Sequence, residues 1–144
     1  MKQKIYVGCS LTQAPQEFKD AIEALKTKLR ENYEVLDFIG TAKGTPRDVY
    51  MWDIHRCVQS CDLFLAICDL PSIGLGWELA VAVEVLKKPV LAVAHQNTKL
   101  TRLLIGAGEE HTCLDIKNYG NISDIPSMVR EKIPVAVERQ LTWC

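Results

Sequence analysis

The segment from Leu63 to Leu86 constrains the fold most, because three different kinds of sequence follow one another in it. Residues 63–68 are a continuous apolar run, which is typical of a parallel strand covered on both faces. Residues 69–76 then bring an aspartate, a proline, a serine and two glycines, which are turn-forming types. Apolar residues return at helical spacing, at Leu79, Ala82, Val83 and Leu86. The segment predicts a buried strand, a tight turn and a helix that begins at or just after the glycines.

The rest of the chain alternates in the same way. Apolar runs predict further strands at residues 4–10, 33–39, 89–94 and 112–116. Helical periodicity predicts helices at residues 16–30, 49–61, 100–105 and 123–141. We expect residues 40–48 to form a loop, and Pro134 to end or kink the last helix.

Strands that alternate with helices predict a parallel sheet with helices on both faces. We therefore expect residues 1–144 to form one domain, an α/β protein with a three-layer Rossmann/flavodoxin-like fold and a five-stranded parallel sheet. A chain of 144 residues is long enough to bury a real core.

Composition excludes several classes of function. The formal net charge is −1 and the pI is about 6.3, so no basic footprint for nucleic acid is indicated. No apolar run approaches the ~20 residues of a membrane span. The N-terminus enters a strand directly and lacks the core of a signal peptide. We expect a cytoplasmic protein with neither nucleic acid nor membrane as a partner.

The six cysteines predict free thiols. Their spacing contains no CxxC pair, and several lie in apolar runs, so we expect buried, reduced side chains in a reducing compartment. A metal site at His55, Cys57 and Cys61 is the alternative. Because the two cysteines lie one helical turn apart on an apolar face, we favour core positions and expect no metal.

Polar residues follow three of the expected strands, where a parallel sheet places its ligand crevice. They are Gly8, Cys9, Ser10 and Thr12 after the first strand, Asp69, Ser72, Gly74 and Gly76 after the third, and residues 95–98 after the fourth. A turn of hydroxyls and glycines at a helix N-terminus can hold phosphate through backbone N–H groups. The glycine spacing matches neither a dinucleotide fingerprint nor a P-loop, so we expect no cofactor.

Two carboxylates, Glu78 and Asp53, have both a structural and a functional interpretation. Glu78 in the first helical turn would gain ~0.3–1 kcal/mol from the helix dipole, and Asp53 could be a solvated helix charge. Two carboxylates at one crevice would instead suit glycosidic chemistry, with one as nucleophile and the other handling protons. Spacing alone leaves both interpretations open.

Residues 53–83 resemble the nucleoside 2-deoxyribosyltransferase family, and most of all its branch of 2′-deoxynucleoside 5′-phosphate N-hydrolases. The shared pattern is an aspartate on a helix, a Cys-Asp pair before an apolar strand, and a turn of the form P-S-x-G-x-G-aromatic-E-L. The first strand, K-I-Y-V-G-C-S, is also similar to that of the family. The likeness spans Lys4 to Gly106.

The resemblance implies catalytic roles for three residues. Glu78 matches the nucleophile, which attacks C1′ of the sugar and forms a glycosyl-enzyme ester. Asp53 matches the acid that engages the sugar and assists proton transfer. Tyr6 matches a tyrosine whose hydroxyl positions the nucleophile, although it could equally be a core residue.

The resemblance also implies the substrate contacts. Ser10 and Ser72 match hydroxyls that contact a 5′-phosphate, although both could simply cap turns. Thr101 falls near a phosphate-contacting serine that a neighbouring subunit contributes, so a homodimer is implied. The remaining substrate-binding candidates are glycines that let the backbone approach the ligand, namely Gly8, Gly74 and Gly76.

One departure from the pattern concerns phosphate. The hydrolases carry a basic residue shortly after the first-strand serine, where this chain has Thr12. Phosphate recognition would then rest on hydroxyls and the helix dipole, with Lys43, Arg47 and Lys99 as the available cations.

Three functions follow from this interpretation. The first is hydrolysis of a (deoxy)nucleoside 5′-monophosphate to free base and sugar phosphate. The second is transfer of 2-deoxyribose between bases, but the transferases carry an acidic residue where this chain has Ser72. The third is a non-catalytic nucleotide-binding module, since fold does not imply function. The presence of both Glu78 and Asp53 argues against that third function.

Overall fold

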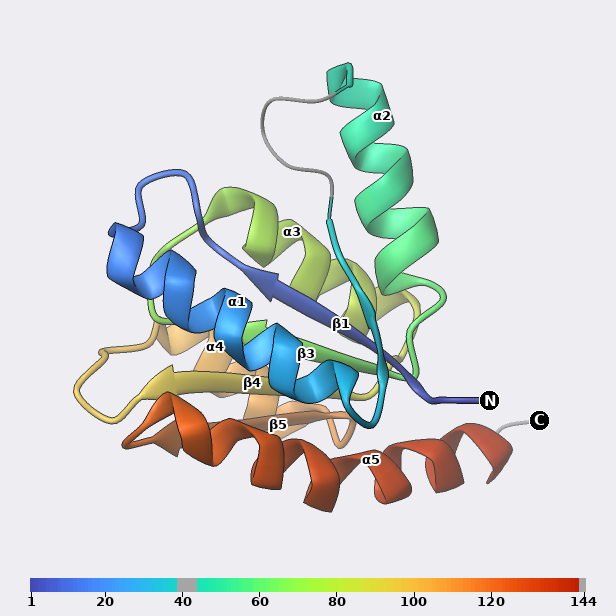
Figure 1. Ribbon diagram of the computed structural model, residues 1–144. Coiled ribbons are helices and arrows are strands. Elements are labelled where there is room, and N and C mark those ends of the chain that lie inside the picture. Colours follow the sequence, from blue (N-terminus) through green and yellow to red (C-terminus); the bar gives the residue numbers. More distant parts are fainter. Residues whose placement is uncertain (39–43, 143–144) are drawn as a thin grey trace.

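The computed structural model describes residues 1–38 and 44–142, without the side chains of residues 135–142. In this part of the chain five parallel strands form one sheet in the order β2-β1-β3-β4-β5 (Figure 1). The strands are β1 (Lys4–Cys9), β2 (Glu34–Leu36), β3 (Leu63–Ile67), β4 (Val90–His95) and β5 (Leu114–Tyr119). The expected five-stranded parallel sheet is confirmed.

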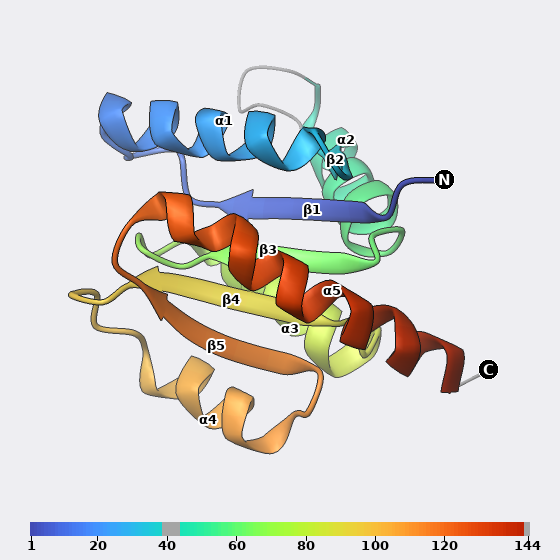
Figure 2. The ribbon, with the colours of Figure 1, turned by 60° about the horizontal axis from the view of Figure 1, so that its bottom comes forward.

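Helices cover both faces of the sheet (Figures 1 and 2). One face carries α1 (Gln16–Arg30) and α5 (Ile125–Thr142), which follows the short turn η3 (Ile122–Asp124). The other face carries α2 (Pro46–Tyr50) with η1 (Met51–Val58), α3 (Ile73–Ala80) with η2 (Val81–Val85), and α4 (Arg102–Glu110). The three-layer α/β architecture is therefore confirmed.

Strand alternation divides the core into two clusters. Ile5 and Val7 of β1 face α1 and α5, whereas Tyr6 between them faces α3 and η1. All of β3 is buried, because helices cover the sheet on both sides. In the described residues, no helix has the length and apolar character needed to cross a bilayer.

The helix after β3 begins earlier than expected. Ser72 is its N-cap, and its hydroxyl accepts a hydrogen bond from the backbone N–H of Leu75. Gly74 and Gly76 therefore belong to the first turn of α3 and do not form a turn before it. Glu78 consequently lies in the second helical turn, so its expected place in the first turn is wrong.

Several other boundaries also differ from expectation. Thr45 caps α2 through a reciprocal pair of hydrogen bonds with Asp48, so the helix begins within the expected loop. The strand expected at 33–39 is shorter, because β2 ends at Leu36 and residues 37–38 belong to no strand. Residues 39–43 lie outside the described residues. The helix α4 and the strand β5 both extend further than expected, to Glu110 and Tyr119.

Pro134 was expected to end or kink the last helix. It lies inside α5, so the expected end of the helix at this residue is wrong. Its position is exposed, so water can reach the carbonyl that the missing N–H leaves without a helical partner.

The segments η1 and η2 are π-helical, with i→i−5 hydrogen bonds from Gln59 to Ile54 and from Leu86 to Val81. Such wide turns are frequent near functional sites. Trp52 of η1 is partly exposed, and its indole N–H donates to the backbone carbonyl of Asp37.

Candidate active site

Tyr6 and Glu78 form the centre of the candidate site. The Tyr6 hydroxyl donates a hydrogen bond to Glu78 Oε2 at 3.0 Å. Tyr6 lies in the middle of β1 and is 1% exposed, while Glu78 is half-buried and extends from α3 across the same face of the sheet. The two residues are 72 positions apart in the sequence, and the packing of α3 against the sheet brings them into contact.

The surroundings of Glu78 shift its ionisation toward neutral pH. Burial raises the pKa of Glu78 to about 7, the hydrogen bond from Tyr6 lowers it, and the charge of Asp53 raises it. Burial also raises the pKa of Tyr6, and the charges of Glu78 and Asp53 raise it further. The phenol therefore remains a hydrogen-bond donor, and Glu78 changes its ionisation near pH 7.

Asp53 approaches this pair from the η1 segment. It is half-buried, and its charge acts on both Glu78 and Tyr6. The structure therefore brings Tyr6, Asp53 and Glu78 into one neighbourhood from three different elements. Their catalytic roles remain predictions.

The hydroxyls expected to contact phosphate lie at the ends of elements. Ser10 directly follows β1 and is half-buried. Ser72 and Thr101 are the N-caps of α3 and α4, and they accept hydrogen bonds from the backbone N–H groups of Leu75 and Leu103. Both caps have a structural role, and phosphate contact remains a prediction.

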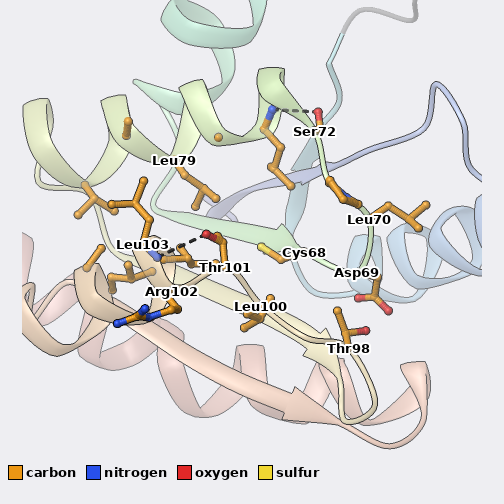
Figure 3. Close-up of a pocket in the computed structure, with 18 of the residues that line it drawn as sticks. Cys68, Asp69, Leu70, Ser72, Leu79, Thr98, Leu100, Thr101, Arg102 and Leu103 are labelled. Carbon is orange, nitrogen blue, oxygen red and sulfur yellow. Dashed lines mark hydrogen bonds between the residues drawn. The ribbon is translucent and has the colours of Figure 1, made fainter.

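A cavity of about 610 Å³ separates α3 from α4 (Figure 3). Ser72, Gly76 and Thr101 line it, together with leucines of both helices, whereas Tyr6, Asp53 and Glu78 do not. Within one chain, Tyr6, Asp53 and Glu78 therefore form one group, and Ser72, Gly76 and Thr101 line a cavity that does not include it.

The three candidate glycines differ in their surroundings. A Cβ on Gly76 would meet nothing within 4 Å, and one on Gly74 would meet only the Ser72 hydroxyl at 3.8 Å. The protein itself leaves both positions open, so their use by a ligand remains a prediction. A Cβ on Gly8 would lie 2.7 Å from Phe64 and 3.2 Å from Glu78 Oε2. Phe64 is a site neighbour that the sequence analysis missed; its place opposite Tyr6 depends on strand order.

Two of the three cations considered for phosphate are described, and they belong to different parts of the fold. Lys43 lies outside the described residues. Arg47 is exposed in the first turn of α2, and Lys99 is exposed at the cavity between α3 and α4.

Within residues 1–38 and 44–142, no group of three or more histidine, cysteine or acidic side chains could hold a metal ion. Cys57 and Cys61 are buried and donate to backbone carbonyls, whereas His55 is exposed and bonded to Gln59. The five described cysteines are free, and Cys144 lies outside the described residues.

The fold is shared with three solved structures. A CMP N-glycosidase from Clostridium botulinum, BcmB, is 20% identical with a TM-score of 0.68, over 89% of this chain and 98% of that one. A 2-deoxyribosyltransferase from Leishmania mexicana is 16% identical with a TM-score of 0.56, over 65% of each chain. A conserved protein from Enterococcus faecalis V583 is 15% identical with a TM-score of 0.55, over 91% and 99%.

At these identities the likeness establishes the fold, and the fold implied by the resemblance in residues 53–83 is confirmed. Neither a family model nor a curated protein sequence matches this chain.

Proposed function

We propose that the protein cleaves the N-glycosidic bond of a (deoxy)nucleoside 5′-monophosphate and releases the free base. The observation that carries this proposal is the buried hydrogen bond between Tyr6 and Glu78, with Asp53 close enough to act on both. The shared fold with a CMP N-glycosidase supports the class of substrate.

The reaction runs through a covalent intermediate. Tyr6 binds Glu78 Oε2, so the other carboxylate oxygen attacks C1′ of the sugar. The C1′–N bond breaks, its electron pair leaves with the base, and the base takes up a proton. Asp53 engages the sugar and assists this proton transfer. Water then attacks C1′ of the glycosyl-Glu78 ester and releases the sugar phosphate.

Ser10 and Ser72 contact the 5′-phosphate in this proposal. Ser10 directly follows β1. Ser72 caps the N-terminus of α3, whose free N–H groups favour an anion. We place the reaction in the cytoplasm, where reduced thiols such as the five free cysteines persist.

A homodimer completes the site in this proposal, with Thr101 reaching the phosphate of the neighbouring subunit. Large apolar side chains on α3 and α4 support such an interface, because they are far more exposed than is usual for a monomer. They are Ile73 at 94%, Leu103 at 83% and Trp77 at 62% exposure. The cavity between the two helices adds to this apolar face.

The second candidate is a nucleoside 2-deoxyribosyltransferase, which the fold shared with the Leishmania mexicana enzyme favours. Both reactions use the same glycosyl-enzyme ester and differ in whether water or a second base attacks it.

One experiment separates the two functions. The protein is incubated with CMP, dCMP and the other 5′-monophosphates, and with the matching nucleosides, each with and without a free acceptor base. Products are then separated by chromatography. We expect release of base from monophosphates without an acceptor. Equal use of nucleosides, with products that depend on the acceptor, would favour transfer. An absence of any base release or exchange would refute both enzymes.

A further inference from the structure

The register of β1 and β3 places a pair of large side chains next to a pair of small ones, on the sheet face that α3 covers. Tyr6 pairs with Phe64, and two residues further along Gly8 pairs with Ala66. Because side chains alternate along a strand, these two pairs share one face of the sheet. A pair of aromatic rings thus adjoins a pair of very small residues, and all four positions are buried.

The large pair is packed ring on ring. The rings of Tyr6 and Phe64 stack with centroids 5.0 Å apart and an interplanar angle of 27°. Phe64 is 0% exposed, so its ring is enclosed by other side chains of the packed interior. The phenol that donates to Glu78 therefore has an aromatic wall along one side.

The small pair leaves room for two larger groups. A Cβ on Gly8 would lie 2.7 Å from Phe64 Cε2 and 3.2 Å from Glu78 Oε2. The Phe64 ring and the Glu78 carboxylate therefore both occupy space that any side chain at position 8 would take. Real Cβ atoms essentially never show non-bonded contacts under 3.0 Å, so alanine here must displace the Phe64 ring. The contact of 3.2 Å with Glu78 Oε2 is also tight, so the carboxylate must move by a few tenths of an ångström.

We propose that Phe64 and Gly8 are positioning residues, which hold the Tyr6 hydroxyl and the Glu78 carboxylate at hydrogen-bonding distance. Phe64 acts through the Tyr6 ring, and Gly8 acts by having no side chain in the space of the carboxylate. In this proposal Gly8 makes room for the Glu78 carboxylate and does not serve to contact the substrate. The catalytic consequence rests on the proposed function, whereas the geometric part does not.

The groups around Glu78 determine what a disturbed hydrogen bond would do. Tyr6 of β1 faces it, as do Asp53 and Cys57 of η1. Cys9 of β1 packs on the opposite face of the sheet, although the charge of Glu78 still acts on its thiol. Burial raises the pKa of the thiols of Cys9 and Cys57 to about 11 and about 12, so both are neutral at pH 7. Asp53 is then the charged neighbour, and Tyr6 is the donor that stabilises the ionised Glu78.

The test is a Phe64→Leu variant, in which leucine keeps the site apolar but removes the ring that supports Tyr6. Loss of the hydrogen bond from Tyr6, with burial retained, should raise the pKa of Glu78 by about 0.5–1 unit. The pKa is measured by a ¹³C NMR titration of the glutamate carboxyl groups, and the Glu78→Gln variant identifies the Glu78 signal by its disappearance.

Leu65→Ala is the matched control. Leu65 is the next residue of β3 and is also 0% exposed, but it faces α1 and α5. This variant weakens the same strand and should leave the pKa of Glu78 unchanged. A pKa in Phe64→Leu that is unchanged or lowered, or a control that shifts as much as Phe64→Leu does, overturns the proposal.

Gly8→Ala gives a second, independent measurement. It should also raise the pKa of Glu78, because the new methyl group separates the carboxylate from the phenol. With CMP as the probe, both variants should lower kcat about tenfold or more and change KM less than threefold, since orientation governs the chemical step. If the wild-type protein releases no base from CMP or any other nucleotide, the proposed function fails, and the NMR titration still decides the positioning role.

Discussion

At the scale of single residues, Glu78 owes its character to tertiary neighbours. It lies in the second turn of α3, so the helix dipole, which acts within the first turn, does not explain its presence. Burial raises its pKa to about 7, against the opposing hydrogen bond from Tyr6. A half-buried carboxylate that ionises near neutral pH suits the attack on C1′ that we propose for it.

Replacing Glu78 by glutamine tests its role as the nucleophile. The amide keeps the shape of the side chain and can still accept from Tyr6, but it is a poor nucleophile. We expect the Glu78→Gln variant to fold and to lose base release by several orders of magnitude. Turnover is measured on the best monophosphate of the panel. Activity close to wild type, or a trapped glycosyl ester on another residue, would exclude Glu78.

Ionisation of Glu78 should also appear in the pH profile of activity. The attacking form is the carboxylate, so kcat/KM should rise with pH through about 7 and level off above it. A profile that is flat between pH 5 and pH 8 would contradict a nucleophile with this pKa.

The same ionisation should reduce stability at high pH. The pKa of Glu78 is about 7 in the folded protein against a reference value of 4.5, so the folded state binds more protons between these values. The free energy of unfolding must therefore fall as pH rises through this window. Glu78→Gln removes the effect and should be about 1–3 kcal/mol more stable than wild type at pH 8. Denaturant unfolding at pH 8 and pH 4.5 measures this, and an equal difference at both pH values would refute it.

At the scale of elements, Ser72 at the N-terminus of α3 has two roles: it caps the helix, and we propose that it binds phosphate. Ser72 accepts from the N–H of Leu75 and so caps the helix. Replacement by alanine would therefore cost about 0.5–2 kcal/mol of stability through the lost cap alone. A variant that keeps the cap is needed to isolate phosphate binding.

Ser72→Asp meets this requirement, because aspartate is an equally good N-cap. Its negative charge should repel a 5′-phosphate, so we expect KM for monophosphates to rise at least tenfold. KM for the matching nucleosides and the thermal midpoint should change little. Steady-state kinetics on CMP and cytidine make the comparison. An equal change for both substrates would remove Ser72 from the phosphate site.

At the scale of the whole molecule, α3 and α4 present an apolar face that nothing within the described chain covers. Leu103 is 83% exposed beside the cavity between the two helices. Apolar surface of this kind is usually covered by a partner. A second copy of the chain is the partner we propose, because it would bring Thr101 to the site.

Leu103→Asp tests the homodimer. A charge in the centre of an apolar interface should convert the protein to a monomer and reduce monophosphate hydrolysis. Sedimentation velocity gives the oligomeric state. Lys28→Glu on the opposite face of the sheet is the control and should change neither property. A wild-type protein that sediments as a monomer, or a Leu103→Asp variant that remains dimeric, would refute this interface.

The sequence predicted the elements because their signals are local. The apolar run of β3 and the periodic stripe of α1 marked a buried strand and a helix, and their alternation indicated a parallel sheet. The motif around Glu78 indicated the fold that the solved structures share. Local signals failed at the helix after β3, where Ser72 begins the helix before two glycines that resemble a turn.

Contacts between distant residues were decided only by the tertiary structure. The sequence named Tyr6 and Glu78 separately, but their hydrogen bond requires β1 beside β3 and α3 packed across both. Phe64 was hidden within an apolar run that no pattern divides, and its stacking on Tyr6 depends on strand register. Strand order and register arise from how whole elements pack, so no local pattern of residues contains them.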